Sequence, residues 1–186
     1  MSLTLGGKPI DGFMYDAIRW TREEKAAFIE MEVSINVLEY FTAVYYIMLW
    51  SEKCENKVIH LECDNTAAVS WIVKSRAGHS SYADALTKVF SLFCLKYNIT
   101  VTCTHIEGAR NIIADQKSRD LLYYSQDADE GVANGPVSSA SNKREICRRL
   151  LLECIIRPAS MHGPNLLRLL TLLHTSHGRS SLSSST

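Results

Sequence analysis

The stretch Val58-Ile59-His60-Leu61-Glu62-Cys63-Asp64-Asn65-Thr66 decides the fold. Residues 58–63 are β-branched or largely apolar, a pattern typical of a short buried strand. Asp64 ends this run, and Asn65-Thr66 then provide helix-capping side chains, which predicts a helix from Ala67 to about Ser75. A strand that passes directly into a helix is the basic unit of an α/β sheet.

The elements on both sides extend this pattern. Tyr82 to Lys96 is predicted to be an amphipathic helix, and the alternation in residues 99–104 predicts a second strand. Strands that alternate with helices favour a parallel sheet, so we expect the two strands to pair in parallel. The crossover between them should be right-handed. Upstream, Ser34 to about Lys53 is apolar around almost its whole circumference, which predicts a central buried helix. The sequence therefore indicates an α/β protein.

Shorter elements complete the predicted domain, residues 1–122. Leu3–Leu5 and Phe13–Tyr15 could be strands, and Thr21 with Glu24 three residues later indicates a helix start. Gly108 marks a turn, and residues 111–118 are predicted to form a short helix.

The remainder of the chain changes in composition. Residues 123–142 are rich in Asp, Gly, Ser and Ala and are predicted to be a linker. Residues 143–178 are predicted to be a basic helical extension, with helices at Ile146–Leu152 and Leu166–His174, and residues 179–186 a disordered tail. We expect the basic residues at 143–149 to form a solvated helix face.

Composition excludes some classes of protein. The formal net charge is zero, so the charge of the whole chain does not indicate a nucleic-acid partner. The six cysteines form no Cys-x-x-Cys spacing, which disfavours a zinc site and fits a reducing, intracellular compartment, cytoplasmic or nuclear. No apolar run reaches the roughly 18 residues needed to span a bilayer, so no membrane partner is expected.

Three carboxylates stand out because they lie in largely apolar elements: Glu39, Asp64 and Asp115. An unpaired carboxylate in such a place is costly unless an ion or hydrogen bonds compensate it. A shared divalent metal is the simplest common partner. We therefore expect the three carboxyl groups to lie within roughly 4–8 Å of one another, the span of a two-metal site. His105 ends the second predicted strand and would lie at the same edge.

Structural roles remain open for each of these residues. Glu39 could be an exposed or ion-paired helix residue, and Asp64 could be a helix cap. Asp115 could be a surface acid near Arg119, and His105 a histidine at the end of a strand. Three further residues could belong to a solvated loop rather than touch a phosphate backbone: Lys74, Arg76 and His79.

Three segments in this order resemble one family. They are Ile35–Glu39, Cys63–Ala68 and His105–Arg119, which together with Trp20 are similar to the ribonuclease H domain of retroelement polyproteins. The similarity is greatest to retrotransposons of the DIRS type, in which reverse transcriptase and ribonuclease H accompany a tyrosine recombinase. The resemblance covers about residues 20–119 and implies a ribonuclease H-like mixed sheet with flanking helices.

The resemblance also implies a chemistry. Members of the family hydrolyse the RNA strand of RNA–DNA hybrids with two Mg²⁺ (or Mn²⁺) ions held by four carboxylates. The last three of these match Glu39, Asp64 and Asp115, while His105 would assist proton transfer or product release. Implied partners are the hybrid and the reverse transcriptase and recombinase domains of the same polyprotein, in a context of DNA integration. Residues implied to contact nucleic acid are Asn65, Thr66, Lys74, Arg76, Asn111 and Arg119.

The sequence departs from the family pattern in two places. Glu107 replaces a usual proline, and the first catalytic aspartate is missing: Asp16 lies only four residues before Trp20, too close to take its place. We therefore expect a sheet without its first strand, an open edge beside the site, and little or no nuclease activity. The alternative is a catalytically degenerate fragment that binds nucleic acid at most.

Overall fold

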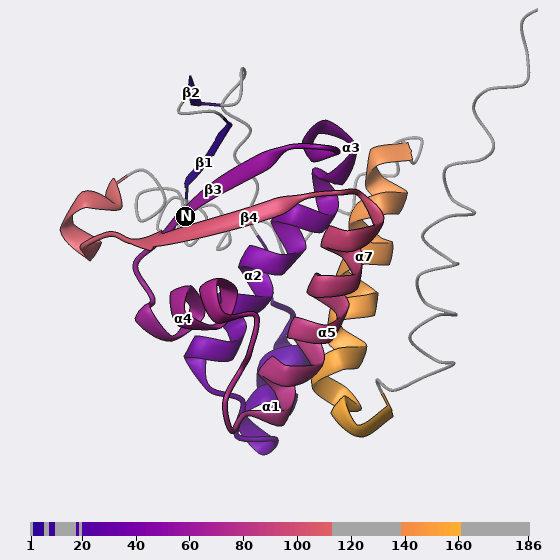
Figure 1. Ribbon diagram of the computed structural model, residues 1–186. Coiled ribbons are helices and arrows are strands. Elements are labelled where there is room, and N and C mark those ends of the chain that lie inside the picture. The colour runs from indigo at the N-terminus through magenta and orange to yellow at the C-terminus, as the bar shows by residue number, and fades with distance from the viewer. Residues whose placement is uncertain (1, 6–7, 10–17, 19, 113–138, 161–186) are drawn as a thin grey trace, which may run out of the picture.

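The computed structural model describes residues 2–5, 8–9, 18, 20–112 and 139–160. This part of the chain is mixed α/β, with the described helices gathered on one side of a small sheet (Figure 1). The predicted α/β class is thereby confirmed at this level. The predicted strand at Phe13–Tyr15, the helices at 111–118 and 166–174 and the tail at 179–186 lie wholly or almost wholly outside the described residues.

The sheet has the strand order β2-β1-β3-β4. Strands β3 (Val58–Cys63) and β4 (Thr100–His105) pair in parallel, with Cys63 opposite His105, so this prediction is confirmed. Strand β1 (Ser2–Leu5) pairs antiparallel with β3, and β2 (Lys8–Pro9) pairs antiparallel with β1. Strand β1 therefore takes up the backbone groups along one side of β3, and β4, which ends beside Cys63, is an edge strand of the described sheet.

Local signals fix where most helices begin. Helix α1 (Arg22–Glu30) starts with the predicted capping box between Thr21 and Glu24. Helix α4 (Thr66–Lys74) follows the Asn65 cap, and α5 (Ser81–Lys96) follows a Ser80 cap. The single helix predicted from residue 34 to about 53 is divided at Trp50 into α2 (Ile35–Leu49) and α3 (Ser51–Cys54).

Helix α2 lies at the centre of the hydrophobic core, as its all-round apolar sequence predicts. Tyr40, Phe41, Ile47 and Met48 are all fully buried. The buried Tyr40 hydroxyl is hydrogen-bonded to the Thr87 hydroxyl of α5, with 3.0 Å between the two oxygens. This packing positions α2, and with it Glu39 on its second turn, against the rest of the core.

Helix α7 (Ser139–Ile156) packs against α2 and α5 (Figure 1). It begins inside the stretch predicted to be a linker, and its inner face belongs to the same core as the sheet: Cys147, Leu150, Leu151, Cys154 and Ile155 are all buried. None of the helices described is both long and apolar enough to cross a membrane.

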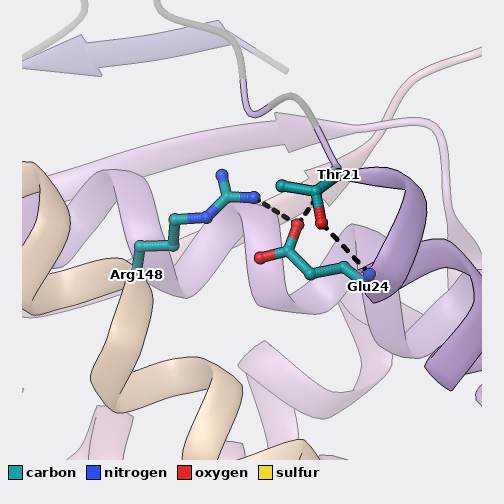
Figure 2. Close-up of polar contacts among 3 residues, drawn as sticks. All are labelled: Thr21, Glu24 and Arg148. Carbon is teal, nitrogen blue, oxygen red and sulfur yellow. Dashed lines mark hydrogen bonds and ion pairs between the residues drawn. The ribbon is translucent and has the colours of Figure 1, made fainter.

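The basic residues of α7 were expected to form a solvated face, but Arg148 forms an ion pair within the protein. Figure 2 shows its guanidinium ion-paired with Glu24, whose carboxylate also accepts a hydrogen bond from the Thr21 backbone N–H at 2.8 Å. The same guanidinium lies 5.3 Å from the centre of the Trp20 ring, a cation–π contact. Arg148 therefore fastens α7 to the start of α1.

Candidate functional site

The carboxyl end of β3 brings two of the predicted site residues together. Asp64 follows the last residue of β3 and is exposed, while Glu39 lies on the second turn of α2 and is half-buried. Donor atoms of Glu39, Asp64 and the intervening Cys63 all lie within 4.8 Å of one another. Asp115, the third predicted carboxylate, lies outside the described residues.

The two carboxylates repel each other. Burial raises the pKa of Glu39 above its ordinary value, the charge of Asp64 raises it further, and a hydrogen bond from the Asn65 side chain opposes both effects. Within the described ranges no lysine or arginine forms an ion pair with either acid. Two converging acids that find no lysine or arginine among the described residues are the electrostatic arrangement that a divalent cation stabilises.

Asn65 holds the two acidic elements in register. Its side-chain oxygen accepts a hydrogen bond from the backbone N–H of Ala68 at 2.9 Å, which caps α4. Its side-chain amide donates to Asn36 at the start of α2, at 2.8 Å. Since Asn65 also hydrogen-bonds Glu39, it links the helix that follows Asp64 to the helix that carries Glu39. These partners give Asn65 a positioning role, and its contact with nucleic acid stays a prediction.

Cys63 is the member of the cluster that sequence reasoning missed. Its side chain is 2% exposed, and burial raises the pKa of its thiol. The backbone N–H of Asn65 donates to its sulfur at 3.4 Å. The alternation of β3 was a usable signal: it places Cys63 on the same buried face as Ile59 and Leu61, toward the helix that carries Glu39.

The remaining predicted residues differ in their exposure. His105 is exposed and ends β4 opposite Cys63, so it lies at the same end of the sheet. Asn111 is half-buried just after a short 3₁₀ helix, Gly108–Arg110. Arg119 lies outside the described residues. The predicted nucleic-acid contacts on and just after α4 are all exposed: Thr66, Lys74 and Arg76.

Comparison with known proteins gives no relative. No protein-family model, no curated protein and no solved structure matches this chain. Its function is therefore inferred from the residues and their geometry.

Proposed function

We propose that this chain is a divalent-metal-dependent nuclease of the ribonuclease H type, which hydrolyses the RNA strand of RNA–DNA hybrids in a retroelement context. The observation that carries the proposal is the convergence of Glu39 and Asp64, from two separate elements, at the carboxyl edge of a parallel strand pair. Ligands and catalytic groups gather at such edges in α/β proteins.

Each residue has a definite task in this scheme. Glu39 and Asp64 hold Mg²⁺ or Mn²⁺, with Asp115 as a further ligand. Two such ions, when bound, would supply an activated water and stabilise the leaving oxygen of the phosphodiester. His105, exposed at the end of β4, moves a proton at the same edge. Asn65 orients Glu39 through its hydrogen bond.

A second function is favoured by one specific observation. The family resemblance places a catalytic aspartate on the first strand, yet the first strand here, Ser2–Leu5, which pairs antiparallel with β3, carries no acid. A site short of one ligand binds metal less well and misplaces the activated water. The alternative is therefore a retroelement-derived module that binds nucleic acid without cleaving it.

A hybrid-cleavage assay separates the two functions. The full chain is incubated with an RNA–DNA hybrid labelled on its RNA strand, in Mg²⁺ and in Mn²⁺. The nuclease proposal predicts weak cleavage that Asp64→Asn abolishes and that Asp84→Asn retains, because Asp84 is a half-exposed acid of α5 paired with Lys88. Hybrid binding without cleavage in either metal would favour the binding module.

The cellular setting stays a prediction. All six cysteines are free, and five of them are buried, in keeping with a reducing intracellular compartment. The reverse transcriptase and recombinase domains of a common polyprotein are the proposed partners.

A further inference from the structure

The metal site has a donor that the nuclease scheme does not use. We propose that Cys63 makes the Glu39–Asp64 edge a mixed thiolate–carboxylate site, which takes a thiophilic divalent cation of the Zn²⁺ class in preference to Mg²⁺. Such a cation would compete for the carboxylates that the nuclease needs. The inference rests on the metal-binding half of the proposed function and not on hydrolysis.

The geometry of the three donors suits a small cation. Their donor atoms lie within 4.8 Å of one another, and the donors of a tetrahedral zinc site lie about 3.6 Å apart. The groups therefore need to approach by roughly 1 Å. Asp64 is exposed and Glu39 is half-buried on a long side chain, so both can move this far. Cys63 is fixed by the core and acts as the anchor.

The Cys63 sulfur lies beside the two acids as well as in the core. Cys63 is almost completely buried, yet its Sγ lies within 4.8 Å of a carboxylate oxygen of both Glu39 and Asp64. A cation bound among the three groups would take the sulfur as a thiolate, with the thiol proton released to solvent as the sulfur–metal bond forms. Thiolate donors select zinc-class cations, whereas Mg²⁺ prefers oxygen donors and binds thiolates poorly.

The neighbouring strand offers a matched comparison. Cys103 of β4 is also a buried thiol, and burial raises its pKa to about 12. Within the described part of the chain, however, Cys103 does not belong to a group of potential ligands, whereas Cys63 does. Removing either sulfur deletes one buried thiol from the parallel strand pair, but only the loss of Cys63 removes a metal donor.

Cadmium is a direct probe of this site, because Cd²⁺–thiolate bonds absorb in the ultraviolet. The full chain is titrated with Cd²⁺ and the charge-transfer absorption is recorded. We expect a saturable band for wild type and for Cys103→Ser, which Cys63→Ser and Cys63→Ala lose. Glu39→Gln, at a half-exposed position, should weaken Cd²⁺ binding at least about tenfold. Zn²⁺ should displace Cd²⁺, and excess Mg²⁺ should not.

Several results would overturn the inference. They are an equal band in wild type and in Cys63→Ser, loss of the band on adding Mg²⁺, and Cd²⁺ affinity unchanged in Glu39→Gln. Thermal unfolding of each variant shows whether it is folded. The hybrid-cleavage assay keeps the two proposals apart. A Cd²⁺ band that depends on Cys63, without hybrid cleavage, would contradict the nuclease proposal and support this metal site. Hybrid cleavage without such a band would contradict the metal site and support the nuclease.

Discussion

At the scale of single residues, Glu39 is held against the charge of Asp64 at a cost in stability. Its pKa is raised in the folded protein by burial and by Asp64. Between its ordinary value and this raised value the folded state binds more protons than the unfolded state. The free energy of unfolding therefore falls as the pH rises through that window, and the full penalty is present above it.

Glu39→Gln should remove this penalty, since Gln keeps a hydrogen-bond acceptor for Asn65 but carries no charge. At pH 7 with a chelator present we expect the free energy of unfolding to rise by up to about 1 kcal/mol, the size of a partly screened charge pair. The gain should disappear as the pH falls below the ordinary pKa of glutamate. Urea denaturation at several pH values measures it.

Two further measurements complete this test. Glu145→Gln removes an exposed acid of α7 and should change stability by no more than about 0.5 kcal/mol. Added Mn²⁺ should stabilise the wild type more than Glu39→Gln, because a ligand that binds only the folded state stabilises it. A Glu39→Gln protein that is less stable than wild type in chelator would contradict the repulsion.

The sequence predicted the acids of this site better than its other contacts. Glu39 and Asp64 could be found because a carboxylate in an apolar element is unusual. The alternation of β3 indicated the buried position of Cys63 but not its place beside the acids, since a buried cysteine is ordinary in a strand. The Arg148–Glu24 pair joins residues 124 positions apart, and no local pattern indicates which acid a basic helix residue will meet.

At the scale of elements, local signals located the parallel strand pair and the helices between them. Caps at Asn65 and Ser80 and the alternation of β3 are properties of neighbouring residues, so the sequence displays them directly. The antiparallel position of β1 depends on distant backbone pairing. The early start of α7 was hidden because Ser139-Ala-Ser-Asn142 has a loop-like composition, which the packing of the rest of the helix overrides.

The attachment of α7 to α1 should depend strongly on Arg148. The side chains of Arg148 and Glu24 are only 20% and 18% exposed, so their ion pair is poorly screened. Arg148→Gln loses the charge-assisted hydrogen bond and the contact with Trp20. We expect a loss of about 1–3 kcal/mol in the free energy of unfolding, measured by urea denaturation.

Arg157→Gln is the matched control for that substitution. Arg157 follows α7 and lies 4.0 Å from Glu153, but its side chain is 71% exposed. Its replacement should change stability by less than about 0.5 kcal/mol. Equal effects of the two substitutions would show that the Arg148 contact does not fasten α7.

At the scale of the whole molecule, α7 completes the hydrophobic core and is not an appendage to it. Its buried residues belong to the same cluster as those of α2 and α5: Cys147, Leu150, Leu151, Cys154 and Ile155. Burial of a large aliphatic side chain contributes about 1.5–3 kcal/mol. The leucines and the isoleucine alone then contribute roughly 5–9 kcal/mol, as much as the whole stability of many domains.

A chain that ends at residue 138 should consequently fail to fold cooperatively, whereas one that ends at residue 160 keeps α7. Without the helix, the inner faces of α2 and α5 would be exposed to water, and Glu24 would lose Arg148. The packing of α2 that positions Glu39 beside Asp64 would be lost with these contacts. Cd²⁺ binding should therefore disappear as well. Far-UV circular dichroism and urea denaturation of both chains measure folding. A cooperative transition of the 1–138 chain at the midpoint of the longer chain would show that the sheet and its first helices are a stable unit, to which α7 is merely added.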